Sequence, residues 1–394
     1  MDTRLRDGGK SLDQILREVV WNSDIRCLLQ GFFRTGTLDM GKPYSELVNF
    51  QIRECDKHGS GIRAEGFQVG EPWDGDIEHA PILFLSSNPA YNFHEISPRY
   101  HARRGRVVCP ACGGVMNVKA VGKFLRTRIQ TSPGTGESLH IPLRNGTTKA
   151  VPYWGSVRNN TETLLPDDCL KALPKLKRER ARAVMRHAVC MEIVPFRSKG
   201  EAGVPEALDE CWEQFTRHIL AHAGAAVFVL VGSKVLNTFT CYALTDGERA
   251  KARAVLKNGG IYRKVIGDRE RLIVKADFGQ GKIGKLETSL DKSVLNQLKR
   301  AVEMMLALQP VRNDDEGDCH HIETSTQRKR AWTHRRNCKR RRKSWRRFWG
   351  RGGRWRSVAR RGRGGGRTRG RWTAFCTTFW GRSTVATGNC RCFC

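Results

Sequence analysis

The sequence predicts an α/β fold in which a four-stranded, mostly parallel sheet is sandwiched by helices. Four short apolar runs have the length and composition of buried strands. These runs cover residues 81–87, 187–194, 225–231 and 271–276. Segments with apolar residues at helical spacing alternate with the runs, and such alternation favours parallel strands joined by crossover helices.

The expected helices follow from the three- and four-residue spacing of apolar side chains. The first begins with Ser11 and Gln14, which form a capping-box pattern. Another begins with Pro205, a residue suited to the first turn of a helix. The helices are expected at residues 11–30, 43–57, 167–187, 205–222 and 288–308.

Changes in composition divide the chain into three parts. Residues 1–64 are expected to be an N-terminal helical part, and residues 65–310 the α/β domain. Within that domain, residues 97–150 form a Gly- and Arg-rich insertion with little periodicity. Residues 311–394 are expected to be a disordered tail, because from Thr324 onward the chain holds no Leu, Ile or Met to bury.

The formal net charge of +31 is spread unevenly along the chain. Residues 1–323 hold 47 Lys and Arg against all 39 Asp and Glu, whereas the last 71 residues carry +23. A basic body suits a polyanionic partner, and such a tail binds nucleic acid through phosphates without sequence preference. Its six tryptophans suit single-stranded nucleic acid. An out-of-frame reading of GC-rich DNA is the alternative origin of this tail.

The sequence favours a cytoplasmic monomer with no membrane partner. No run reaches the roughly 18 apolar residues that span a bilayer, and Met1–Arg6 lacks an apolar signal region. The 14 cysteines are then thiols or metal ligands rather than disulfides.

Cys109 and Cys112 form half of a zinc knuckle, which predicts a structural zinc. No second Cys-x-x-Cys follows at the usual spacing, so other side chains would have to complete the site. The candidates are His94, His101, Cys55 and Cys169. The alternative is a reduced turn without metal.

The run after the first strand has the composition of a site. Ser86–Phe93 brings small residues, an amide, a turn proline and two aromatics to a strand end. Ligands bind at the carboxyl ends of strands in open α/β sheets. Asn88 would hold a water there, and Tyr91 or Phe93 would stack on a flat ring. The alternative is a strand-to-helix turn in which Asn88 satisfies the backbone and the aromatics belong to the core.

Three further strand ends are expected at the same edge of the sheet. They are Glu192–Lys199, Gly232–Lys234 and Ala276–Lys285. Because parallel strands end at one edge, a cleft between these segments is the default binding site.

These segments together resemble the uracil-DNA glycosylase superfamily over residues 65–308, apart from the insertion. Ser87-Asn88-Pro89-Ala90 is similar to that family's Gly-x-Asn-Pro-Gly loop after the first strand. Val229–Lys234 resembles its third strand and glycine turn, and the segments Glu71–Asp76 and Pro152–Trp154 also fit the family. The resemblance implies a four-stranded parallel sheet between helices.

The resemblance also implies base excision from double-stranded DNA. A nucleotide is flipped out of the duplex, and a held water completes cleavage of the N-glycosidic bond. Asn88 takes the water-positioning role, Tyr91 or Phe93 the stacking role, and Ser87 a place beside the base. No cofactor is required for this step. The implied contacts to DNA come from the last two loops, at Ser233, Lys234, Lys275, Gln280 and Lys282.

The first departure from the family lies at the end of the second strand, where uracil enzymes use an asparagine to read the base. Glu192 stands near that position. A carboxylate accepts but does not donate, so it favours an exocyclic amino group, as on cytosine, over the O4 of uracil. The alternative is a strand-end Glu192 paired with Arg197 or Lys199.

The second departure lies after the fourth strand, where uracil enzymes have a histidine motif. The segment here is Lys275–Lys282, and it contains no histidine. Asp277 is expected to protonate or polarise the departing base, because a cytosine-type base leaves less readily than uracil. The alternative is a glycine-rich loop in which Asp277 only caps the turn.

These departures predict a DNA glycosylase that acts on a modified, cytosine-derived pyrimidine. The chain also resembles bacterial anti-phage DNA glycosylases of this superfamily, and that resemblance implies excision of glucosylated hydroxymethylcytosine from phage DNA, which would leave abasic sites as antiviral defence. Trp73, Tyr153 and Trp154 are then either sugar-stacking or core residues. The alternatives are a uracil-DNA glycosylase in base excision repair and a non-catalytic nucleic-acid-binding protein.

Overall fold

The computed structural model describes most of the first 308 residues. The described ranges are 9–58, 67–102, 105–108, 115–131, 140–143, 147–198 and 204–308. The chain divides into two units, Met1–Arg312 and Asn313–Cys394, and every described residue belongs to the first. The expected tail at 311–394 and the cysteines Cys109 and Cys112 therefore lie outside the described residues.

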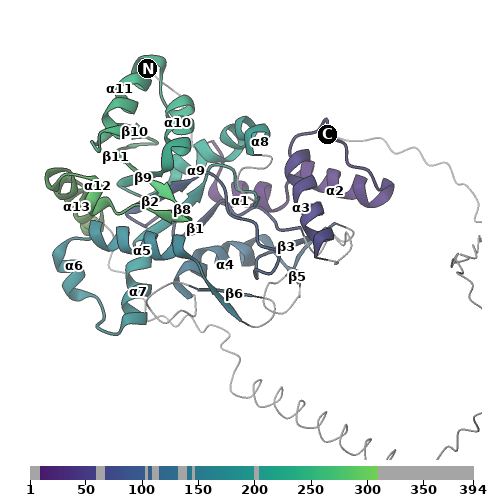
Figure 1. The fold of residues 1–394 in the computed structure, drawn as a ribbon, viewed down its shortest axis with the longest axis horizontal. Helices are drawn as coiled ribbons and strands as arrows, with labels where there is room; N and C mark the ends of the chain where they lie inside the picture. The colour runs from purple at the N-terminus through teal and green to yellow at the C-terminus, as the bar shows by residue number, and fades with distance from the viewer. Residues whose placement is uncertain are drawn as a thin grey trace, which may run out of the picture. The chain divides into compact units, whose positions relative to one another are not determined.

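A mixed sheet of six strands forms the centre of the first unit (Figure 1). The strand order is β1-β8-β2-β9-β11-β10. The bounds are β1 (Trp73–Gly75), β2 (Ile82–Ser86), β8 (Ala188–Glu192), β9 (Val227–Val231), β10 (Tyr262–Ile266) and β11 (Arg269–Ala276). The four expected strands are the central ones, β8, β2, β9 and β11, and they are parallel to one another.

The prediction of a four-stranded sheet was wrong at both edges. β1 pairs antiparallel with β8, and β10 pairs antiparallel with β11. β1 has only three residues, too few to show a periodic pattern. β10 alternates buried and exposed positions and carries Arg263 and Lys264, so it does not read as an apolar run. Edge strands commonly carry such charges.

Helices cover both faces of this sheet, because successive strand residues point to opposite sides. One face packs in a core with α1 (Leu12–Val20), α2 (Ser23–Thr35), α3 (Ser45–Lys57), α4 (Val118–Thr131), α8 (Val204–Cys211), a π-helical turn (Trp212–Thr216), α9 (Arg217–His222), α10 (Gly232–Ala243) and α11 (Asp246–Lys257). The other packs with α5 (Pro152–Leu164), α6 (Asp167–Ala172), α7 (Lys177–Met185), α12 (Leu286–Ser289) and α13 (Lys292–Ala307). The result is a three-layer α/β/α arrangement.

Two expected helices are each divided in two. The segment 11–30 breaks before α2, where the Asn22 side chain accepts a hydrogen bond from the Ile25 amide at 3.0 Å and caps the new helix. The segment 167–187 breaks around Pro174 into α6 and α7, because proline cannot continue a helix. The spacing of apolar residues does not predict these breaks, because a capping side chain and a proline cause them.

Residues 97–150 contain more regular structure than their sequence suggests. Besides α4, they form the small sheet of β3 (Arg99–His101), β4 (Arg106–Val108) and β5 (Val115–Met116). The pair β6 (His140–Pro142) and β7 (Thr148–Ala150) follows. The helix α4 packs against β1 and α7, so it covers one edge of the main sheet.

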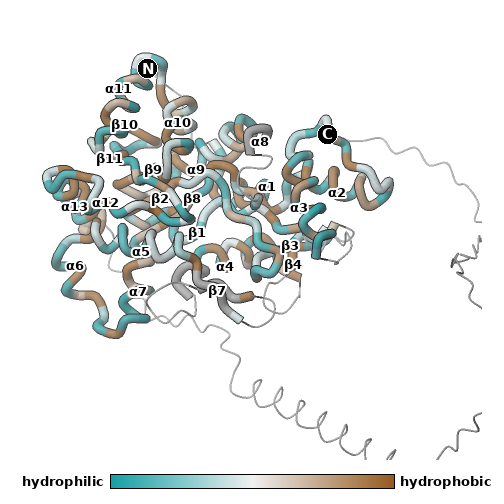
Figure 2. Tube along the Cα trace, in the orientation of Figure 1, coloured by the Kyte–Doolittle hydropathy of each residue, from teal (hydrophilic) through white to brown (hydrophobic). Residues whose placement is uncertain are grey.

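Hydrophobic residues occur along the central strands and on the helices that pack against them (Figure 2). Every residue of β2 and β9 is buried. None of the helices that the structure describes is long and apolar enough to cross a membrane.

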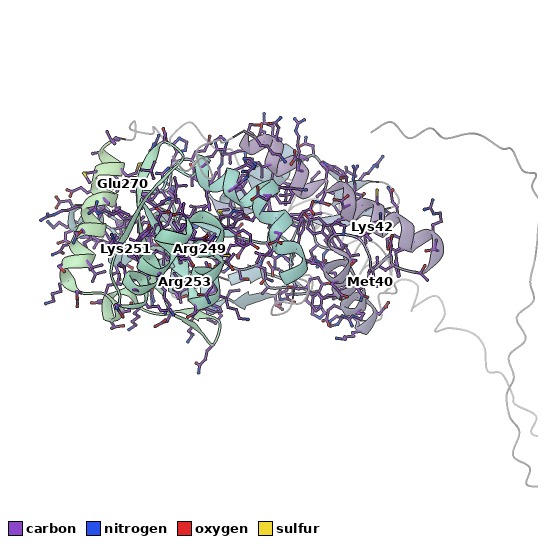
Figure 3. All side chains as sticks on the ribbon, turned by 90° about the horizontal axis from the view of Figure 1, so that it is seen from above. Met40, Lys42, Arg249, Lys251, Arg253 and Glu270 are labelled. Atoms are coloured by element: carbon purple, nitrogen blue, oxygen red, sulfur yellow. The ribbon has the colours of Figure 1, made fainter. Side chains whose placement is uncertain are left out.

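The helix α11 braces α10, whose first turn lies at the carboxyl end of β9. Arg249 donates from Nη2 to the Cys241 carbonyl at 2.7 Å, and Arg253 donates from Nε to Thr240 Oγ1 at 2.8 Å. Both arginines lie far from Met40, which marks the loop between α2 and α3 (Figure 3). These contacts fix α10 against α11, and α10 begins at the carboxyl end of β9.

Candidate functional site

A cavity of about 890 Å³ lies at the carboxyl ends of the central strands. Its walls come from the segments that follow β2, β8, β9 and β11, together with the first turn of α5. Six predicted site residues line it: Ser87, Asn88, Tyr91, Glu192, Ser233 and Lys234. The expected convergence of four strand ends is therefore confirmed.

The loop after β2 is held by the segment that follows β8. The Tyr91 amide donates to the Ser198 carbonyl at 2.9 Å, and the Ser198 amide donates to the Pro89 carbonyl at 3.2 Å. The Asn88 side chain donates from Nδ2 to Ser198 Oγ at 2.9 Å. Its Oδ1 accepts no hydrogen bond from a described residue. Asn88 thus offers an acceptor to the cavity.

A buried ion cluster of Arg197, Glu71 and Glu95 locks this arrangement. Arg197 Nη2 lies 2.5 Å from Glu71 Oε2 and 3.0 Å from Glu95 Oε1. Its Nη1 also donates to the Ala90 carbonyl at 2.7 Å. All five N–H groups of the guanidinium are engaged within the protein, so it has none left for a ligand.

This cluster bears on the alternative in which Glu192 pairs with Arg197. The five N–H groups of Arg197 donate to Glu71, Glu95 and the Ala90 carbonyl. The other suggested partner, Lys199, lies outside the described residues. Glu192 remains a carboxylate in the wall of the cavity.

Polar side chains gather on the face of the sheet that α5 covers. Ser86 pairs with Glu192 across parallel strands, and Asp74 pairs with Cys190 across the β1–β8 edge. Cross-strand partners share a face, and Cys190 and Glu192 are two residues apart. All four therefore point to the same side and line the cavity.

Tyr153, in the first turn of α5, completes this polar wall. Its hydroxyl lies 2.6 Å from Ser86 Oγ. Burial, with Cys190 and Glu192 nearby, raises the pKa of the Tyr153 phenol well above its usual value. The hydroxyl therefore keeps its proton at neutral pH.

The charged lining of the cavity is mainly acidic, although the chain is basic. Its acids are Glu71, Asp74, Glu95 and Glu192, and its cations are Arg197 and Lys234. Because Arg197 engages Glu71 and Glu95, the carboxylates of the lining outside this cluster are Asp74 and Glu192, and they supply acceptors to the interior. Such a lining suits a ligand with amino or other N–H and O–H donors.

The two aromatic residues of the first loop have different surroundings. Tyr91 lines the cavity, packs edge-on against Phe50 with ring centroids 5.6 Å apart, and bonds to Cys55 Sγ at 3.6 Å. Burial raises the pKa of Tyr91 above its usual value. Phe93 is outside the cavity lining and stacks on His58, with centroids 4.5 Å apart. Of the two stacking candidates, only Tyr91 is within reach of a bound ring.

The segment after β11 forms a hairpin beside the cavity. Its strands are β12 (Phe278–Gly279) and β13 (Lys282–Ile283), and its turn residues Gln280 and Gly281 both have positive φ. The Ile283 amide donates to Ser156 Oγ of α5 at 2.9 Å, which anchors the hairpin. Phe278 is 52% exposed and lines the cavity.

The polar residues predicted on this segment do not line the cavity. Asp277 has a side chain that is 75% exposed, and it bonds to Lys275 Nζ at 2.5 Å. Lys275, Gln280 and Lys282 are likewise absent from the lining. The acid role expected of Asp277 would require its carboxyl to move toward the cavity.

Sequence reasoning gave Asp74 no role in the site and did not find the two glutamates that bind Arg197. Asp74 belongs to Trp73-Asp74-Gly75, where a short strand is buried despite its carboxylate. The signal for Arg197 was its position after a predicted strand, but its partner Glu71 is 126 residues away in sequence.

The metal prediction at Cys109 and Cys112 lies outside the described residues. Within the described ranges, one group has metal-ligating atoms within 4.8 Å of one another: Asp76, Glu78 and His79. Asp76 and His79 are hydrogen-bonded to each other at 3.0 Å. None of the additional ligands expected for the zinc belongs to this group.

No protein-family model matches the chain, and no curated protein matches it significantly. Function is therefore inferred from the residues of the cavity.

Proposed function

We propose that the protein is a DNA glycosylase that hydrolyses the N-glycosidic bond of a flipped base. The observation that carries this proposal is the pairing of Asn88 and Glu192 in one cavity at the strand ends. Asn88 offers an acceptor for water, and Glu192 an acceptor for the base edge. The volume of about 890 Å³ is within the range of small-molecule sites, and Tyr91 supplies an aromatic wall.

In the proposed reaction, Asn88 orients a water molecule by accepting a hydrogen bond from it. The water oxygen forms a bond to C1′ of the sugar as the C1′–N bond breaks, and the bonding electrons leave with the base. A water proton neutralises the departing base. Positioning of this kind lowers the activation free energy, because both reactants are already oriented when the bond forms. Lys234, which is exposed and lines the cavity, and the first turn of α10 suit the DNA backbone.

The acceptor-rich wall supports a cytosine-derived base as the substrate. Glu192 and Asp74 would accept from amino or hydroxyl donors, whereas the O4 of uracil, which replaces the amino group of cytosine, would face a carboxylate. The cavity leaves room for a base with a substituent. Glucosylated hydroxymethylcytosine in phage DNA, excised as antiviral defence, is the most specific form of the proposal.

The proposal is tested with DNA duplexes that each contain one candidate base. Uracil, cytosine, hydroxymethylcytosine and glucosylated hydroxymethylcytosine are compared, and abasic sites are revealed by cleavage with alkali. Release from an amino-bearing base supports the proposal. Release only from the uracil duplex would favour the repair enzyme, and release from none would exclude a glycosylase acting on these bases.

Replacing Glu192 by Gln is expected to change the base preference. The amide can donate to a carbonyl oxygen, so release from uracil should rise relative to release from a cytosine-type base by about tenfold or more. The ratio of kcat/KM for the two duplexes measures this shift. Glu287→Gln, an exposed change on α12, is the matched control and should leave the ratio unchanged. An unchanged ratio in Glu192→Gln would remove Glu192 from base recognition.

Removing residues 324–394 is expected to separate catalysis from non-specific binding. The +23 charge of that segment supports the rival function, a nucleic-acid binder led by its tail. A glycosylase should keep base release under single-turnover conditions and show weaker, less salt-dependent DNA binding. Loss of binding from a chain that releases no base would favour the binder.

A further inference from the structure

The amide of Asn88 has two chemically opposite ends, and its neighbours decide which end faces the cavity. Nδ2 donates to Ser198 Oγ at 2.9 Å and lies 3.4 Å from the Pro89 carbonyl oxygen. A carbonyl oxygen only accepts, so a reversed amide would bring two oxygens together there. A serine hydroxyl can also donate, so the Pro89 carbonyl makes the orientation selective. Oδ1 is left as an acceptor in a cavity-lining residue.

Ser198 is itself held in place by its backbone. It is fully buried, its amide donates to the Pro89 carbonyl at 3.2 Å, and its carbonyl accepts from the Tyr91 amide at 2.9 Å. A β-bridge joins Ala90 to Ser198. The preceding residue, Arg197, is the centre of the buried ion cluster. The Ser198 hydroxyl therefore meets Asn88 from a fixed position.

We propose that Ser198 is a positioning residue that holds the Asn88 amide in the orientation selected by the Pro89 carbonyl, with the oxygen end toward the bound water. This inference rests on the proposed function for the identity of that water. With Oδ1 toward it, the water donates a hydrogen bond to Asn88 and keeps a lone pair for attack on C1′. With the amide reversed, Nδ2 would donate to that lone pair and oppose the attack. Ser198 also lines the cavity, and the role proposed for it is exerted through Asn88.

The kinetic test compares Ser198→Ala with Ser198→Thr, which restores the hydroxyl. Probes are the duplexes with hydroxymethylcytosine and glucosylated hydroxymethylcytosine, and full-length protein is used under single-turnover and steady-state conditions. We expect kcat to fall about tenfold in Ser198→Ala, with KM within twofold, and to recover in Ser198→Thr. Ser293→Ala, an exposed serine of α13, is the control. An unchanged kcat in Ser198→Ala would overturn the proposal. It would also be overturned if kcat fell equally in Ser198→Ala and Ser198→Thr while the Tm of both variants stayed unchanged.

A second measurement does not depend on activity. In full-length protein labelled with ¹⁵N-asparagine, the side-chain NH₂ signal of Asn88 is identified by its loss in Asn88→Asp. Its protons should exchange with solvent at least several-fold faster in Ser198→Ala than in the wild type or in Ser198→Thr. Equal exchange rates would show that Ser198 does not hold the amide and would overturn the inference. If the wild type releases no base, the proposed function falls, and the exchange rates alone decide the positioning role.

Discussion

Asn88→Ala should lower the rate of base release at least 100-fold while leaving DNA binding almost unchanged. The variant removes the acceptor that orients the attacking water, and orientation of a reactant supplies a large part of a catalytic barrier. The side chain is half-buried and bonded to Ser198, so its loss costs one neutral hydrogen bond, about 1 kcal/mol of unfolding free energy. The measurements are single-turnover base release, DNA affinity and Tm.

Asn237→Ala is the matched control for this prediction. Asn237 is an exposed asparagine on α10 and lies outside the cavity lining. It should behave as the wild type in all three measurements. A fall of less than tenfold in Asn88→Ala would assign the water to another group. A parallel loss of DNA affinity would make Asn88 a binding residue instead.

The candidate site was predictable where its residues directly follow buried strands. An apolar run that ends in polar residues marks a strand end, and parallel strands bring such ends to one edge. Ser87, Asn88 and Glu192 were found in this way, and the cavity unites them. The same reasoning placed Asp277 at the carboxyl end of β11, and its backbone does lie there. Its side chain, however, bonds to Lys275 and does not line the cavity.

The rest of the site depends on partners that are distant in sequence. Asp74 reaches the cavity because a three-residue edge strand pairs with β8. Tyr153 reaches it because α5 starts beside Ser86, which is 67 residues earlier. Phe93 and Tyr91 differ by two positions in one loop, but Phe93 stacks on His58 of the segment after α3. Periodicity along the chain carries no information about such pairings.

The contrast between chain charge and cavity charge fits two separate steps of recognition. Excess cations on the body, at +8, attract a polyanion over distances of about a Debye length. The acidic lining acts only on a group that enters the cavity. For a DNA-acting protein, backbone attraction would bring the duplex close without regard to sequence, and the carboxylates would then select the base.

Replacing Arg197 by Ala should destabilise the fold more than any surface change. Arg197, Glu71 and Glu95 are all more than nine-tenths buried, and removal of the cation leaves two carboxylates without compensation. Breaking a buried ion cluster in this way costs about 3–5 kcal/mol, which lowers Tm by roughly 10 °C for a domain of this size. Thermal unfolding followed by circular dichroism measures the change. The loop from Ser86 to Asn92 should also loosen, because the Ala90 carbonyl loses its donor.

A triple variant distinguishes loss of the cation from loss of packing. Arg197→Met combined with Glu71→Gln and Glu95→Gln removes every charge of the cluster, so its Tm should lie well above that of Arg197→Ala. Lys171→Ala is the matched control, because Lys171 and Asp168 form an ion pair at 2.9 Å with side chains 77% and 91% exposed. Its Tm should equal that of the wild type, since exposed pairs contribute little. Equal Tm values for the single and triple variants would show that packing around the guanidinium, and not its charge, stabilises this edge of the sheet.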